Sequence, residues 1–177
     1  MLLIDEEQVK ASLSYDELIA AMRQALMDFS AGRMVQPLRM VVPVAAHSGW
    51  FAVMTAVHED VMGAKMVTFY PGNADREKHT HQAVIHLFRA DTGEPQAMMD
   101  GRLITEMRTA AVSAVAVDLL ARPAAKVLGI LGSGVQARSH GRALSRIRKC
   151  EEIRVWIRTE RKAKKFADEG LGESGVG

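Results

Sequence analysis

Hydrophobic and polar residues follow a helical period at the start of the 177-residue chain. Apolar side chains recur on one face over residues 15–31, and Ser14 with Glu17 has the spacing of a capping box. Gly32 stands where a helix commonly ends. Asp5 and Gln8, nearer the N-terminus, are also three residues apart, as the ends of a capping box are. The pattern therefore predicts a short helix capped by Asp5 and a longer helix over residues 15–31.

Short apolar segments separated by turn residues occupy residues 33–100. They predict an antiparallel meander of about five strands, namely Leu38–Val44, Trp50–Ala56, Gly63–Tyr70, Gln82–Arg89 and Gln96–Met99. The sequence Asp91-Thr92-Gly93-Glu94 is typical of a hairpin turn, with Gly93 suited to a positive φ. The polar stretch of residues 71–80 indicates a mobile loop.

The helical period returns over Leu103–Leu120, where alanines predict a long helix that packs closely. Beyond it, residues 127–131 form a continuous apolar run that is typical of a buried parallel strand. A helix at 135–148, a strand at 153–157 and a charged helix at 160–169 complete a β-α-β-α order. We therefore predict an α/β chain with an α+β domain over residues 1–121 and a truncated Rossmann-type parallel unit over 122–177. Leu171–Gly177 shows no usable pattern.

Composition narrows the class of protein. With 48% hydrophobic and 25% charged residues, the chain can fill a core. A net charge of +2 is too small to recruit nucleic acid or an anionic membrane. No apolar run approaches the roughly 18 residues that span a bilayer. Cys150 is the single cysteine, which excludes an internal disulfide framework and favours a reducing cytoplasm.

The sequence Gly132-Ser133-Gly134-Val135-Gln136-Ala137 follows a predicted strand and opens a predicted helix. In that context a G-x-G-x-x-A motif indicates a dinucleotide site. The first glycine permits the tight turn, the second lets a pyrophosphate approach the backbone, and the alanine keeps the helix close to the strand. The positive end of the helix would hold the phosphates. The alternative is a plain strand-to-helix turn without a ligand.

Residues after the second strand of this unit bear on the choice of cofactor. An NAD site usually has an acidic residue there to accept from the ribose 2′-hydroxyl. This chain instead has Ile157, Arg158 and Thr159. A guanidinium matches a 2′-phosphate in charge and geometry. We therefore expect NADP(H) to be preferred, with NAD(H) possible; the alternative is that Arg158 is an ordinary solvated arginine.

Two motifs carry a resemblance to a known family. They are Met99-Asp100-Gly101-x-x-Ile104-Thr105-x-x-Arg108-Thr109-Ala110-Ala111 and Ile130-Leu131-Gly132-x-Gly134-Val135-Gln136-Ala137. At this spacing the chain resembles the ornithine cyclodeaminase/mu-crystallin family, and in detail its ketimine reductase branch. Further matches are Gln36–Arg39, Lys65–Tyr70, His81-Gln82 and Arg158-Thr159.

The resemblance implies a homodimer formed through the antiparallel sheet, with a Rossmann domain beside it in each subunit. It implies a small amino-acid or imino-acid substrate and hydride transfer between a nicotinamide and an imine carbon. Arg39, Lys65 and Arg108 would bind the substrate carboxylate, and Lys65 is the catalytic candidate. Thr109, together with Gly132, Ser133, Gly134, Val135, Gln136 and Ala137, would meet cofactor phosphate.

The residues themselves agree with a carboxylate site, because a carboxylate in a closed pocket needs charge-assisted donors. Lys65 interrupts an otherwise apolar strand, so it is held for a partner or exposed at a sheet edge. It would donate a proton if neighbouring arginines depressed its pKa. Arg108 lies in an alanine-rich helix, where a solvated position is the alternative. His79, His81 and His86 lack metal-site spacing, so we expect no metal.

The resemblance implies family members of more than 300 residues, so we expect this chain to match their N-terminal portion. We expect it to bind cofactor poorly and to turn over little or nothing by itself. Three other activities stay open. One is an NAD-dependent ornithine cyclodeaminase, which an acid in place of Ile157 would favour. The others are an alanine dehydrogenase and a non-catalytic, crystallin-like binding protein, since a fold can host several functions.

Overall fold

The computed structural model describes residues 1–169, which form two compact units. Met1–Ser12 and Ala25–Thr105 make the first unit, and the second takes Leu13–Gln24 and the residues from Glu106 onward. Helices α2 (Tyr15–Ser30) and α3 (Arg102–Leu120) therefore contribute to both units. A functional division at residues 121 and 122 stays a prediction, and Leu171–Gly177 lies outside the described residues.

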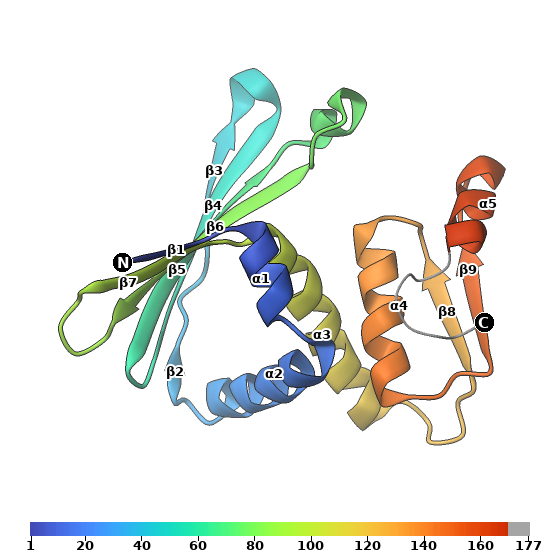
Figure 1. Cartoon of the computed structure of the whole chain (residues 1–177), viewed down its shortest axis with the longest axis horizontal. Helices are drawn as coiled ribbons and strands as arrows, with labels where there is room; N and C mark the ends of the chain where they lie inside the picture. The colour runs from blue at the N-terminus through green and yellow to red at the C-terminus, as the bar shows by residue number, and fades with distance from the viewer. Residues whose placement is uncertain (170–177) are drawn as a thin grey trace. The chain divides into compact units, whose positions relative to one another are not determined.

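A mostly antiparallel sheet forms the first unit (Figure 1). Its strand order is β1-β7-β6-β5-β4-β2, and β3 also pairs with β4. The predicted meander is confirmed, with strands β3 (Met40–Val44), β4 (Gly49–His58), β5 (Val61–Phe69), β6 (His81–Arg89) and β7 (Pro95–Asp100).

Two strands of this sheet have no counterpart in the predicted elements. β1 (Leu2–Ile4) pairs in parallel with β7, and β2 (Met34–Val35) pairs antiparallel with the end of β4. Both are too short to show a period. The predicted loop of residues 71–80 contains a 3₁₀ helix, η2 (Pro71–Arg76), and a second one, η1 (Ala45–His47), joins β3 to β4.

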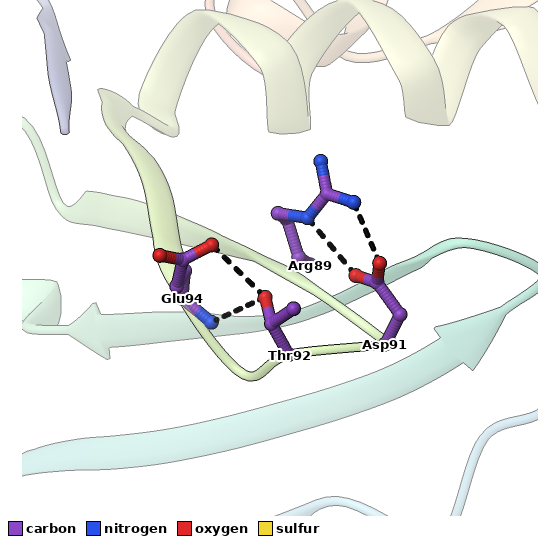
Figure 2. Close-up of polar contacts among 4 residues, drawn as sticks. All are labelled: Arg89, Asp91, Thr92 and Glu94. Carbon is purple, nitrogen blue, oxygen red and sulfur yellow. Dashed lines mark hydrogen bonds and ion pairs between the residues drawn. The ribbon is translucent and has the colours of Figure 1, made fainter.

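The predicted hairpin turn joins β6 to β7, and Figure 2 shows its polar contacts. Gly93 has a φ of 75°, which glycine adopts without strain. Arg89 donates from Nε and Nη2 to the two carboxylate oxygens of Asp91, at 2.9 and 2.6 Å. The Arg89 guanidinium lowers the pKa of Asp91. On the other side of the turn, the Thr92 hydroxyl donates to a Glu94 carboxylate oxygen at 3.1 Å.

Both predicted N-terminal helices are present with their caps. In front of α1 (Glu6–Ser12), the amide of Asp5 donates to Gln8 Oε1 at 3.0 Å, and the amide of Gln8 donates back to Asp5 Oδ1 at 2.9 Å. This is the reciprocal arrangement of a capping box. Helix α2 ends before Gly32, whose φ of 72° gives the left-handed cap.

The core of the second unit lies among three helices. Ala110, Ala111 and Ala114 of α3 are fully buried against α2 and α4 (Val135–Ile147), as the small-residue pattern predicts, whereas Ala116 is exposed. Small side chains let helix backbones approach closely, so this contact is tight. The cluster consists of Ile19, Ala110, Ala111, Ala114, Val115, Ala143 and Leu144.

Strands β8 (Val127–Leu131) and β9 (Glu152–Trp156) run parallel and form a two-stranded sheet, followed by α5 (Glu160–Glu169). The expected β-α-β-α order is present, but the expectation of a fully buried β8 is wrong. Ile130 is buried, whereas Val127 is 48% and Leu131 84% exposed. The described part of this sheet has two strands, so only alternate residues of β8 are covered.

Candidate functional site

The glycine turn joins β8 to α4 with the backbone that its sequence requires. Gly132 has a φ of 115°, a conformation that residues with a Cβ rarely adopt. Its amide donates to the carbonyl of Trp156 at 2.9 Å, which ties the turn to the end of β9. Gly134 is extended and precedes the first residue of α4, and no side chain caps the helix.

Within residues 1–169, the space in front of this turn is open. A Cβ built on Gly132 or on Gly134 would meet none of their atoms within 4 Å. The first amides of an α-helix have no partner within the helix, and Gly134 offers no side chain in their place. An open backbone surface at the positive end of a helix fits the pyrophosphate of a dinucleotide. Ser133, Val135, Gln136 and Ala137 complete this turn and the first residues of α4.

The turn after β9 lies at the same edge of the small sheet. Leu131 pairs with Trp156, so the carboxyl ends of the two parallel strands stand side by side. Arg158 and Thr159 follow at exposed positions, with Ile157 before them. The glycine turn and the two residues expected to meet a ribose phosphate therefore share one edge, where ligands of doubly wound sheets bind.

Two hydrogen-bond contacts join helices α3 and α4 behind the glycine turn. Ser139 Oγ donates to the carbonyl of Glu106 at 3.2 Å, and Ser113 Oγ lies 2.9 Å from His140 Nε2. Thr109 lies between Glu106 and Ser113 on α3, one turn before Ser113. Thr109 therefore lies on the part of α3 that faces the second turn of α4, and its role at cofactor phosphate stays a prediction.

Sequence reasoning missed the polar residues that hold α4 in place. Ser139 is completely buried, and its hydroxyl lies 2.8 Å from the hydroxyl of Tyr15. Burial raises the pKa of Tyr15. From sequence, a serine in an amphipathic helix is expected to face solvent. Its position on the apolar face of α4 was the one feature that could have predicted its burial.

Lys65 lies in β5, between β4 and β6, and is half-buried. It is therefore not on an edge strand, which removes the simplest alternative for this lysine. Its Nζ donates to Thr105 Oγ1 at 3.5 Å, a long contact with a buried hydroxyl in α3. The ammonium thus lies on the face of the sheet from which α3 departs.

A glycine lets α3 start close to that face. A Cβ on Gly101 would lie 3.0 Å from Cβ of Ala83 and 3.1 Å from Cγ1 of Ile85. The amide of Gly101 donates to the carbonyl of Ala83 at 2.8 Å. Since Ile85 pairs with Lys65, this close approach brings the first turn of α3 next to the lysine.

Arg39 is exposed and stands one residue before β3. Met40 pairs with Val53, and one further step of the register would set Arg39 beside Met54, which pairs with Lys65 on its other side. Arg39 itself lies outside the pairing of β3, which begins at Met40, so its place relative to Lys65 stays a prediction. Arg108 is partly buried in the part of α3 that belongs to the second unit. A site shared by all three cations stays a prediction.

The three histidines considered as metal ligands and the cysteine lie in or next to β6 and between α4 and β9. His79 is exposed before β6, while His81 and His86 are partly buried in β6, and Cys150 is a free thiol between α4 and β9. Among residues 1–169, no three His, Cys, Asp or Glu side chains are grouped so that they could hold a metal ion. None of the helices in that range is long and apolar enough to cross a membrane.

Comparison with known proteins shows the family of the chain. The sequence model of the ornithine cyclodeaminase/mu-crystallin family matches residues 1–176. Ketimine reductase mu-crystallin from Mus musculus is 43% identical in an alignment 176 residues long, which covers 96% of this chain and 56% of that protein. The chain spans about half the length of the curated relatives that it matches.

Solved structures agree with the sequence match. Thermococcus litoralis Delta(1)-pyrroline-2-carboxylate reductase, in complex with NADH and L-proline, has a TM-score of 0.91 and 36% identity, covering 96% of this chain and 53% of that one. An archaeal alanine dehydrogenase dimer with bound NAD also has a TM-score of 0.91, with 31% identity and coverage of 95% and 52%.

Proposed function

The chain belongs to the ornithine cyclodeaminase/mu-crystallin family, and from this premise we propose that it carries the cofactor turn and the carboxylate-binding residues of an NAD(P)H-dependent reductase of cyclic ketimines. The observation that carries the proposal is the open glycine turn at the carboxyl edge of β8 and β9. When bound there, the nicotinamide cofactor supplies the hydride that reduces the imine carbon.

The residues of the chain bind and orient the substrate in this proposal. Arg39, Lys65 and Arg108 hold the carboxylate, which cannot leave water for a closed pocket without such donors. The position of Lys65 in an inner strand of the sheet, with Nζ 3.5 Å from Thr105 Oγ1, supports its part in this assignment. Lys65 is also the candidate to give the imine nitrogen its proton, so that hydride and proton together yield the cyclic amino acid.

The proposed cofactor is NADP(H). Arg158 and Thr159 stand beside the glycine turn without an acidic residue before them, an arrangement that suits a 2′-phosphate better than a 2′-hydroxyl. NAD(H) remains a second possible cofactor, and relatives of the chain are solved with NADH and with NAD. We further propose a homodimer formed through the antiparallel sheet, acting in the cytoplasm.

We also propose that the 177-residue chain binds cofactor weakly and turns over slowly. Its small parallel sheet leaves Leu131 84% exposed at the cofactor edge, so much of the expected nucleotide site has no wall in the described residues. Steady and fast reduction of a cyclic ketimine by the purified chain would contradict this part of the proposal.

The alternatives differ in product, which makes them separable. The chain would be incubated with NADPH and Delta(1)-pyrroline-2-carboxylate, with NADH and pyruvate plus ammonium, and with NAD and ornithine, and products identified by mass spectrometry. We expect proline from the pyrroline alone. Alanine from pyruvate would indicate a dehydrogenase, proline and ammonia from ornithine a cyclodeaminase, and saturable cofactor binding without product a binding protein.

A pair of lysine variants ties the product to the proposed site. Lys65→Met should reduce proline formation about tenfold to hundredfold, since one charge-assisted hydrogen bond to the carboxylate is lost. Lys10→Met, on the exposed last turn of α1, is the matched control and should leave the rate unchanged. Equal rates in the two variants would contradict the assignment of Lys65.

A further inference from the structure

Arg138 makes a contact that the proposed function leaves unexplained. It lies in the first turn of α4, where its amide donates to the carbonyl of Gly134 at 3.3 Å. Its guanidinium carbon stands 4.5 Å from the centre of the Phe166 ring. Phe166 belongs to α5 and is only 4% exposed. An arginine at this distance over a covered ring forms a cation–π interaction.

Phe166 is the large apolar side chain with which α5 is anchored. The rest of the helix consists of charged residues and alanines, and its charged side chains over residues 160–168 are exposed. A helix with so little apolar surface gains little from burial elsewhere. The contact with Arg138 therefore joins the buried aromatic ring of α5 to the first turn of α4.

The position of α5 in turn sets the position of the turn before it. The carbonyl of Thr159 accepts from the amides of Lys162 and Ala163, both at 3.1 Å, so Arg158 and Thr159 are joined directly to the first turn of α5. Glu160, the acid of that turn, is paired with Lys164 at 3.0 Å.

We propose that Arg138 is a positioning residue for the selection of NADPH over NADH. By holding Phe166, it keeps α5 docked and the Arg158–Thr159 turn at the edge of the sheet where the glycine turn lies. This inference rests on the proposed cofactor site. Arg138 lies outside the turn that binds the phosphate. Its loss should change the preference for NADPH over NADH although no ligand of the 2′-phosphate is removed.

Nucleotide titrations of four variants test this role. Arg138→Met and Phe166→Leu should each weaken NADPH binding about tenfold, the order of a covered cation–π contact, with NADH changed by less than about twofold. Arg138→Lys keeps the cation and should retain most of the preference. Arg146→Met, in the last turn of the same helix and exposed, is the matched control. An equal loss of both nucleotides would show a merely structural role and overturn the proposal.

A double-variant cycle separates positioning from direct contact. If Arg138 acts through Arg158, then Arg138→Met should weaken NADPH binding little further once Arg158→Gln is present. Additive losses would mean that the Arg138 guanidinium contacts the phosphate itself, which would also overturn the proposal.

Trypsin provides a readout without cofactor. Arg158, Arg161 and Lys162 are cleavage sites at the start of α5, and undocking of the helix exposes their backbone. Arg138→Met should be cut there several times faster than the wild-type chain, and Arg146→Met should not. A wild-type chain that binds neither nucleotide would contradict the proposed function, whereas equal cleavage of wild type and Arg138→Met would overturn the anchoring role by itself.

Discussion

Gly132 and Gly134 share one turn but need to be glycine for different reasons. Gly132 has a φ of 115°, so a side chain there strains the backbone. Gly134 has an ordinary φ of −79° with no atom of the described chain close to it, so a side chain there meets none of residues 1–169 but would obstruct a ligand. The fold requires the first glycine, and the proposed pyrophosphate requires the second.

This difference gives a matched pair of variants. Gly132→Ala should lower the free energy of unfolding by about 1–3 kcal/mol through backbone strain. Gly134→Ala should cost less than about 1 kcal/mol but should weaken NADPH binding. Urea denaturation and nucleotide titration measure the two effects. If Gly134→Ala bound NADPH as well as wild type, the turn would not approach the pyrophosphate as proposed.

Tyr15 predicts a loss of stability at alkaline pH. Burial raises the pKa of its phenol from the ordinary value of 10.0, so the folded state favours the protonated form. The stabilisation is fully present below pH 10.0 and is lost as pH rises through the raised pKa. Tyr15→Phe should remove that part of the pH dependence and cost about 1 kcal/mol at neutral pH, because the contact with Ser139 is lost. Denaturation at several pH values would contradict this if both proteins lost stability in parallel.

Residue patterns predicted the turn but not the polar contacts behind it. The spacing of glycines is local information, and the backbone at Gly132 follows from it. The link from Tyr15 to Ser139 joins residues 124 positions apart in sequence, so no local pattern contains it. The contact of Arg138 with Phe166 is missed for the same reason.

At the scale of elements, the ion pair between Glu6 and Arg102 ties α1 to the start of α3. The hydrogen bond from Arg102 lowers the pKa of Glu6 from the ordinary value of 4.5. The stabilisation is therefore present above pH 4.5 and is lost as pH falls through the lowered pKa.

Glu6→Gln should remove this acid dependence. Because Glu6 is half-exposed, we expect a cost at neutral pH of only about 0.2–1 kcal/mol. Hydrogen exchange of the α1 amides at neutral and acid pH measures the effect locally. Protection of α1 that fell with acid equally in Glu6→Gln and in wild type would show that another group is responsible.

Elements with many residues were predicted well, and short or partly covered ones were not. Caps and a 3.6-residue period located α2 and α3 within a residue or two of their observed ends. The strands β1 and β2 have three and two residues, and pairing with distant partners defines them. The apolar run of β8 indicated a parallel strand correctly, but a sequence does not reveal how many neighbours cover it.

At the scale of the whole molecule, the proposed homodimer has a direct test. Met40 and Val42 are exposed apolar residues on one face of β3, and the resemblance assigns the sheet to the dimer contact. The double variant Met40→Lys with Val42→Lys should convert a dimer into a monomer, because charges buried in an interface lack partners. Light scattering after size-exclusion chromatography gives the mass. Leu119→Lys, an equally exposed apolar position in α3, is the control, and a dimer that survived the double variant would exclude this face.

The candidate site is predictable from sequence in its parts. Spacing alone indicates a phosphate turn and an arginine in place of an acid, and the structure sets these at one edge of the small sheet. The carboxylate-binding set rests on the resemblance, because Arg39, Lys65 and Arg108 are too distant in sequence to form a motif. The family model matches residues 1–176, so both motifs that carry the resemblance lie within the matched range.

The most direct measurement is a fluorescence titration of the Trp50→Phe variant, in which Trp156 is the remaining tryptophan. Trp156 is exposed at the end of β9, and its carbonyl accepts from the Gly132 amide, so a nucleotide on the glycine turn should quench it. We predict saturable quenching by NADPH at lower concentrations than by NADH, with the preference lost in Arg158→Gln. Quenching by neither nucleotide would mean that this turn does not bind a dinucleotide in the 177-residue chain, and the central claim would fail for it.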